Sequence, residues 1–152
     1  MSRVAVGGTF DPIHDGHKAL LLKACELSRG GSLLVGLTSG KMAQNKLHDV
    51  EPFAFRYGML KLFIRSLGIE PRIVKLEDPY GPTIHEDFDI LVVSPETHPT
   101  GLKINHIREE KGMKQVKIVL VDYVLAEDGL PISSTRIKDR EIDIHGKVLD
   151  RK

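Results

Sequence analysis

Short apolar runs rich in β-branched residues alternate along this chain with longer segments of helical period, and this alternation constrains its fold more than any other feature. Such an order is typical of α/β proteins, in which crossover helices connect the strands of a parallel sheet. The second run, SLLVGL, is apolar without alternation, as expected for a strand covered on both faces. The five runs are Arg3–Val6, Ser32–Leu37, Arg72–Leu76, Asp89–Val93 and Val116–Val121.

Helical segments occupy the intervals between these runs. Lys18–Ser28 places its large apolar side chains on one face, and Gly30-Gly31 ends it. A segment opened by Pro52 carries apolar residues at alternating spacings of four and three and stops at Gly68, and weaker helices are expected over Leu102–Lys111 and after Ser133-Ser134-Thr135. The order predicts a Rossmann-like, doubly wound α/β fold with a five-stranded parallel sheet.

Length and composition limit the class of protein. The 152 residues suit one domain spanning 1–152, and 22 Lys and Arg against 21 Asp and Glu give a net charge of +1, too little for a broad nucleic-acid-binding field. No apolar run approaches the roughly 18 residues of a membrane span, and the first residues lead into a strand and not a signal peptide. The single Cys25 permits no internal disulfide. We therefore expect a cytoplasmic protein with no membrane or nucleic-acid partner.

The most unusual residues follow the first strand. In parallel sheets ligands bind at the carboxyl ends of the strands, near the point where strand order reverses. Here Gly7-Gly8 and Gly16 let the backbone approach a ligand, and His14 and His17 stand at the start of a helix whose free N–H groups favour anions. The chain lacks G-x-G-x-x-G, and Gly40-Lys41 lacks the earlier glycine of a P-loop. This stretch thus predicts a phosphate-binding cradle of another kind.

Two motifs together carry a family resemblance. Gly7–His17 reads G-G-T-F-D-P-x-H-x-G-H between a strand and a helix, and Ile132–Lys138 reads I-S-S-T-x-I-K. These resemble the two signatures of the HIGH-type nucleotidyltransferases. Over nearly the whole chain the sequence resembles the phosphopantetheine adenylyltransferases of the archaeal type, which are related to eukaryotic bifunctional coenzyme A synthase. The less specific supporting stretches are Gly36–Ser39, Ser94–Thr97, Gly101 and Asn105–Glu110.

The resemblance implies a reaction that joins the phosphate of 4′-phosphopantetheine to the α-phosphorus of ATP, giving dephospho-coenzyme A and pyrophosphate. A phosphate monoester has a second pKa of about 6, so the nucleophile is already ionised at neutral pH and needs no general base. Catalysis must then come from positioning two polyanions and stabilising the leaving charge. A substrate-bound Mg²⁺ is expected, because Mg²⁺ is commonly held by phosphate oxygens and water.

The same resemblance implies roles for individual residues. His17 would donate to the α-phosphate with His14 beside it, and Thr9 would bind the attacking phosphate or bridge it to ATP. Lys46, preferred over Lys41, would steady the reacting phosphates, and Arg108 would hold triphosphate oxygens. The remaining ligand-binding residues implied are Gly8, Phe10, Gly16, Ser133, Ser134 and Thr135. Position 138, often Arg in this signature, is Lys here, which keeps the charge without the fork.

Purely structural interpretations of these residues and alternative functions are also considered. Ser133–Thr135 also fits a simple helix cap, and Lys41, Lys46 and Lys138 also fit ordinary surface charges. Nicotinamide-mononucleotide adenylyltransferases generally open with G-R-F-Q-P, and cytidylyltransferases usually end with R-T-x-G-x-S-T, so both depart from this chain. Transfer to flavin mononucleotide and a silent nucleotide-binding module stay open, although intact catalytic-type residues disfavour the latter. For the oligomeric state we expect a monomer.

Overall fold

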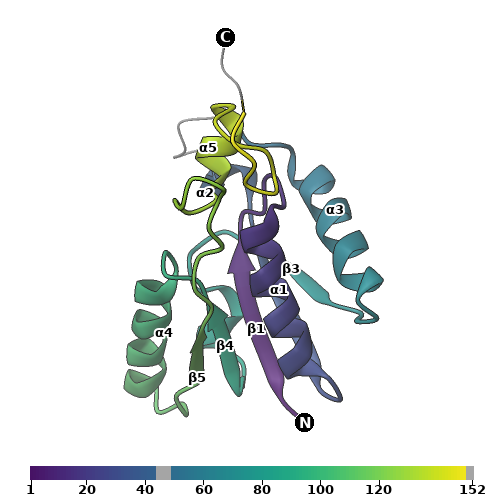
Figure 1. The fold of residues 1–152 in the computed structure, drawn as a ribbon. Helices are drawn as coiled ribbons and strands as arrows, with labels where there is room; N and C mark the ends of the chain where they lie inside the picture. The colour runs from purple at the N-terminus through teal and green to yellow at the C-terminus, as the bar shows by residue number, and fades with distance from the viewer. Residues whose placement is uncertain (44–48, 150–152) are drawn as a thin grey trace.

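The computed structural model describes residues 1–43 and 49–149 and contains one sheet of five parallel strands (Figure 1). The strands are β1 (Arg3–Gly8), β2 (Ser32–Thr38), β3 (Arg72–Leu76), β4 (Ile90–Val93) and β5 (Lys117–Leu120), in the order β3-β2-β1-β4-β5. The strand order reverses between β1 and β4, which pair in parallel through Val4–Val6. All five predicted strands and the doubly wound parallel sheet are confirmed.

Helices cover the two faces of the sheet. Helices α1 (Asp15–Ser28) and α3 (Phe53–Ser66) pack on one face, where Leu21, Leu60 and Ile64 meet the even-numbered apolar residues of β1. Helix α4 (His98–Glu110) and the short 3₁₀ helix η1 (Gly81–Ile84) pack on the other, around Ala5 and Leu91. Opposite faces follow from right-handed crossovers that run in opposite directions from β1. Their ligand crevice is therefore expected above β1 and β4.

Two short helices complete the described chain. Helix α2 (Gly40–Ala43) directly follows β2, and α5 (Ser134–Lys138) lies above the carboxyl ends of the strands (Figure 1). The sequence analysis identified α5 but neither α2 nor η1, because four-residue segments carry too little periodicity to be distinguished from turns. Among the described residues, no helix has the length and apolar character to cross a membrane.

Arg108 corrects one expectation. It lies in the last turn of α4, and a helix of this length rises about 20 Å, so this turn is at the amino edge of the sheet, away from the crevice. Its side chain is 0% exposed. The guanidinium donates to the carbonyl oxygens of Thr83, Glu86 and Lys114 at 2.6–2.8 Å. Arg108 therefore joins η1, α4 and the approach to β5, and it does not hold triphosphate oxygens.

This position predicts a stability role for Arg108. The Arg108→Met variant leaves three carbonyl groups without their donor, so its free energy of unfolding should fall by about 3 kcal/mol. The affinity of the folded protein for ATP should stay within about twofold of wild type. The loss of a charged hydrogen bond to phosphate would weaken binding by more than that. Urea titration and ATP calorimetry measure the two quantities. Arg65→Met, which removes an exposed arginine paired with Glu70, is the matched control; ATP affinity lost at unchanged stability would restore the phosphate role.

Candidate active site

The turn between β1 and α1 forms the floor of the candidate site. Gly8 has no room for a side chain, because a Cβ there would stand 3.1 Å from the ring of Phe10. Phe10 itself has a φ of 50° and is only 2% exposed. Its ring packs in the core and meets the ring of His17 edge to face, with centroids 5.1 Å apart. The ring of Phe10 thus supports His17 from the core, and the ligand contact expected at Phe10 stays a prediction.

His14 is the N-cap of α1. Its Nδ1 accepts hydrogen bonds from the backbone N–H groups of Gly16 at 3.0 Å and His17 at 3.3 Å. Because Nδ1 accepts, the ring proton of the neutral imidazole resides on Nε2, which can only donate. Burial lowers the pKa of His14 from 6.5 to about 4, against the opposing charge of Asp15. His14 therefore presents a neutral N–H donor at physiological pH.

This cap overturns the expectation of free N–H groups at the start of α1. Asp15 N donates to the carbonyl oxygen of Ile144, and Lys18 N donates to that of His14. With Gly16 and His17 bonded to the imidazole, all four backbone donors of the first turn have partners within the chain. The positive end of the helix thus acts on the His14 ring, which its amides polarise. Gly16 contributes space, since a Cβ there would lie 2.9 Å from the His14 ring.

His17 stacks on His14. The ring centroids are 3.7 Å apart with an interplanar angle of 17°. His17 Nδ1 lies 3.1 Å from the carbonyl oxygen of Pro12, and a longer contact of 3.4 Å joins it to His14 N. The shorter contact requires a hydrogen on Nδ1, because a carbonyl oxygen only accepts. The two imidazoles are thus held as one pair by the turn and the helix cap, as the sequence predicted.

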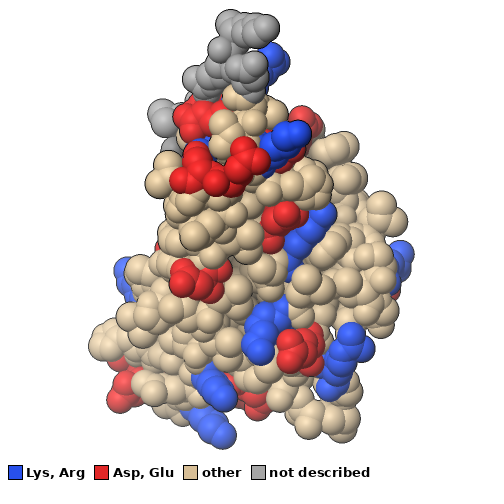
Figure 2. All heavy atoms as spheres, in the orientation of Figure 1, with Lys and Arg blue, Asp and Glu red and all other residues tan. Residues whose placement is uncertain are grey.

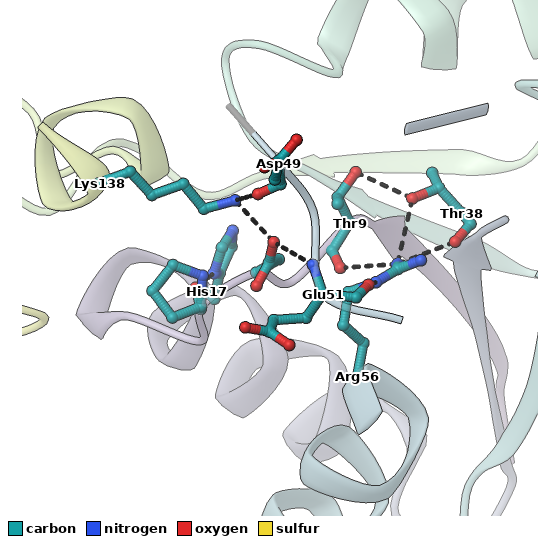
Figure 3. Close-up of polar contacts among 9 residues, drawn as sticks. Thr9, His17, Thr38, Asp49, Glu51, Arg56 and Lys138 are labelled. Carbon is teal, nitrogen blue, oxygen red and sulfur yellow. Dashed lines mark hydrogen bonds and ion pairs between the residues drawn. The ribbon is translucent and has the colours of Figure 1, made fainter. Parts of the chain in front are cut away.

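The second signature is folded against the first. Lys138 in α5 donates from Nζ to Asp11 Oδ2 at 2.7 Å and to the carbonyl oxygen of Asp49 at 2.8 Å (Figure 3). Asp11 is 6% exposed and also accepts from Glu51 N at 3.1 Å. Its carboxylate therefore joins the β1–α1 turn, the approach to α3 and α5. Two segments 127 positions apart are brought together, as the crevice requires.

The three hydroxyl residues of the second signature occupy different positions at the start of α5. Ser133 is the N-cap of α5, and its Oγ accepts from Arg136 N at 3.2 Å, so this hydroxyl serves the helix. Ser134 and Thr135 form the first turn of α5 above the same crevice. Arg136 points into ion pairs with Asp128 and Glu141, which fix the hairpin around α5. The capping interpretation of Ser133 is thus confirmed.

The predicted lysines are placed unequally. Lys41 is exposed in α2, directly after β2. Lys46 lies outside the described residues, so its expected phosphate contact stays a prediction. On the face drawn in Figure 2, basic and acidic side chains are interspersed. The positive groups that serve the site are local ones, in keeping with the net charge of +1.

Arg56 is a buried residue of the site that the sequence analysis missed. It is 1% exposed and lies in α3, beneath the end of β2. Its guanidinium donates to the carbonyl oxygens of Glu51 at 2.8 Å, Thr38 at 2.9 Å and Thr9 at 3.2 Å (Figure 3). The available signal was its spacing: Arg56 stands four residues before Leu60 on the buried face of α3, where a charge needs a reason.

A cavity of about 160 Å³ lies on the α4 side of the sheet, next to the turn between β1 and α1. Small residues on one sheet face leave the space, namely Ala5 and Gly7 of β1 and Gly36 of β2. Gly36 must be small, since a Cβ there would stand 2.8 Å from the side chain of Leu76. Gly8 and Thr38 also line the cavity, so it borders the polar site directly.

Comparisons with known proteins agree with this geometry. Residues 5–140 match the family model described as cytidylyltransferase-like. The chain is 52% identical to a phosphopantetheine adenylyltransferase of Methanosarcina mazei, over 97% of both chains. It is 50% identical to one of Archaeoglobus fulgidus, over 97% of this chain and 99% of the other. A crystal structure of an A. fulgidus protein superposes with a TM-score of 0.73 at 48% identity, covering 80% of this chain and 98% of that one.

The buried neutral state of His14 predicts a pH dependence of stability. Below pH 6.5 the unfolded chain binds a proton at this position that the folded protein, with a pKa of about 4, does not. Stability is therefore lost as the pH falls from 6.5 toward 4. Between pH 7.5 and pH 5.0 this group should lower the free energy of unfolding by about 2 kcal/mol.

The matched variant is His14→Asn, which keeps an N-cap acceptor for α1 but cannot titrate. Urea titrations of both proteins at pH 7.5 and pH 5.0 give the four free energies needed. The loss on acidification should be about 2 kcal/mol smaller in the variant. Equal losses in the two proteins would show that His14 is not held neutral by burial.

Proposed function

The chain belongs to the cytidylyltransferase-like family and, within it, to the phosphopantetheine adenylyltransferases, and we propose that it transfers the adenylyl group of ATP to 4′-phosphopantetheine. The products are dephospho-coenzyme A and pyrophosphate, so the protein is a nucleotidyltransferase of coenzyme A biosynthesis. The observation that carries this proposal is the meeting of the two signature segments through Asp11 and Lys138 at the carboxyl edge of the sheet.

The reaction needs an in-line displacement at the α-phosphorus of ATP. An oxygen of the acceptor phosphate forms the new bond, and the bond from the α-phosphorus to the bridging oxygen of the pyrophosphate breaks. No proton has to be removed from the nucleophile, because its second pKa is about 6. The task of the protein is to hold both phosphates and to stabilise charge on the leaving pyrophosphate.

The stacked imidazoles suit that task. The ring of His14 is buried and neutral, and its Nε2 donates while its Nδ1 is held by two backbone amides. His17 stacks on it and, with its Nδ1 hydrogen directed to the Pro12 carbonyl, donates to the α-phosphate from Nε2 as an imidazolium in our proposal. A donor fixed before the substrate binds costs no reorganisation as charge develops. Ser134 and Thr135 would serve the β- and γ-phosphates from the opposite side of the crevice.

The cavity suits the acceptor. Its lining beside the polar turn comes from small and apolar residues such as Gly7, Gly36 and Leu76. The arm of 4′-phosphopantetheine carries methyl and methylene groups that gain free energy by leaving water. With the arm in this cavity, its phosphate would lie at Gly8 and Thr9, next to the histidine pair.

The donor set fits a metal carried by the substrate. In the described part of the chain, no group of three or more His, Cys, Asp or Glu side chains is placed to hold a metal ion. Asp11, the buried carboxylate of the β1–α1 turn, already accepts hydrogen bonds from Lys138 and Glu51 N. We propose that Mg²⁺ arrives on the phosphate oxygens of ATP, where it neutralises charge.

The remaining parts of the proposal concern partners and location. We propose a monomeric cytoplasmic enzyme with small-molecule substrates only. A net charge of +1 offers little long-range attraction to nucleic acid.

Release of pyrophosphate from ATP with different acceptors tests the function. We expect product with 4′-phosphopantetheine and none above background with nicotinamide mononucleotide, flavin mononucleotide or glycerol phosphate. Product from one of these alone would retain the reaction class and change the acceptor. Failure with every acceptor, at ATP binding shown by calorimetry, would favour a nucleotide-binding module.

His17→Ala removes a donor that acts on the developing charge. Turnover should fall by roughly 100-fold or more, as found when one such donor is lost, whereas ATP affinity should change far less. Steady-state kinetics and ATP calorimetry on the same preparation separate the two effects. His106→Ala, which removes an exposed histidine of α4, is the matched control. Unaltered turnover in His17→Ala would remove this residue from the mechanism.

A further inference from the structure

Arg56 is a buried cation that forms no ion pair with any of the residues that the structure describes. Its hydrogen bonds go to backbone carbonyl oxygens and to the Thr38 hydroxyl at 3.5 Å. Its Nη2 is buried and has no hydrogen-bond partner among the described residues. The carboxylate that acts on it electrostatically, Asp11, is already bonded to Lys138 and to Glu51 N. A buried charge left this way costs free energy unless something compensates it.

The hydrogen bonds around Arg56 have a fixed direction. The two Nη1 hydrogens of Arg56 go to the carbonyl oxygens of Thr38 and Thr9, and the same nitrogen lies 3.5 Å from Thr38 Oγ1. Thr38 Oγ1 donates its hydrogen to Thr9 Oγ1 at 2.9 Å. Thr9 Oγ1 is thereby an acceptor toward Thr38, and its own hydrogen is directed to a third group. Each bond in such a chain polarises the next, which makes the last hydroxyl a better donor. A hydroxyl prepared in this way favours an anion.

We propose that Arg56 and Thr38 are positioning residues that orient the Thr9 hydroxyl toward the phosphate of the acceptor. The proposal rests on the proposed function, since it assigns one substrate phosphate to this hydroxyl. Arg56 acts through Thr38 and Thr9 and supplies positive charge beneath them, and neither Arg56 nor Thr38 takes part in the bond changes. The acceptor phosphate provides the negative charge that no described residue pairs directly with the buried guanidinium.

The location of Thr38 indicates that it acts on the phosphate of the acceptor and not on the phosphates of ATP. Thr38 and Gly8 line the cavity proposed for the acceptor arm, and Thr9 follows Gly8 in the turn. The stacked imidazoles, which would face the ATP phosphates, belong to the start of α1 on the other side of the same turn. A change at Thr38 should therefore affect the phosphate of the acceptor more than that of the nucleotide.

Thr38→Val is the primary test, because it removes the hydroxyl and keeps the shape. We expect kcat/KM for 4′-phosphopantetheine to fall at least roughly tenfold, the effect of one hydrogen bond to a charged group. The KM for ATP should stay within about twofold, and calorimetric affinity for pantetheine, which lacks the phosphate, should not change. Thr38→Ser should recover most of the loss. Arg56→Met should show the same pattern if it folds, and the Thr38 variants decide the question if it does not.

A double-mutant cycle separates orientation from a general loss of packing. In a Thr9→Val background, the Thr38→Val change should cost no more than about twofold, because the hydroxyl it orients is gone. Ser28→Ala is the control, since it removes a buried hydroxyl of α1 that donates to the carbonyl oxygen of Cys25; its kinetics should match wild type. Additive losses in the cycle, or wild-type kinetics in Thr38→Val, overturn the positioning role alone. Wild-type protein that binds no 4′-phosphopantetheine overturns the proposed function and this inference together.

Discussion

The ion pair between the buried Asp11 and the half-buried Lys138 is the contact on which the rest of the site depends. It joins a turn near the amino end of the chain to a short helix near the other end, and the same carboxylate also receives Glu51 N. Breaking one partner of such a pair leaves an uncompensated charge, which is far more costly than the pair is stabilising. The crevice is therefore assembled before any ligand arrives, and its donors are fixed at positions where charge will develop.

The carboxyl edge of the sheet combines a polar turn, where backbone amides hold a side chain, with an apolar cavity. The backbone N–H groups in the first turn of α1 donate to the imidazole of His14 and to carbonyl oxygens. The positive end of the helix therefore acts on the side chain of His14. On the α4 side of the sheet, small residues at Ala5, Gly7 and Gly36 leave room for an uncharged part of a substrate. A polar edge beside an apolar cavity matches a substrate that carries a phosphate on a long arm.

Two buried arginines show how location decides a role. Arg56 and Arg108 are both nearly inaccessible and both donate to three backbone carbonyl groups. Arg108 ends its helix at the amino edge of the sheet and stabilises the fold there. Arg56 lies near the start of its helix at the carboxyl edge, where its bonds reach Thr9. Each is a basic residue in an amphipathic helix, and the sequence analysis singled out Arg108, although Arg56 is the one whose bonds reach the site.

The sequence by itself determined the five strands, the main crossover helices, the two signatures and the pairing of His14 with His17, because hydrophobic period and short-range motifs fix these locally. The capping role of Ser133 was also readable. Only the tertiary structure decided that the α1 amides are satisfied, that Phe10 belongs to the core, that Arg108 serves the fold, and that Asp11, Arg56 and Thr38 meet at the site. Those outcomes depend on which groups are neighbours across the sheet and on how far each is removed from water, and neither is a property of spacing along the chain.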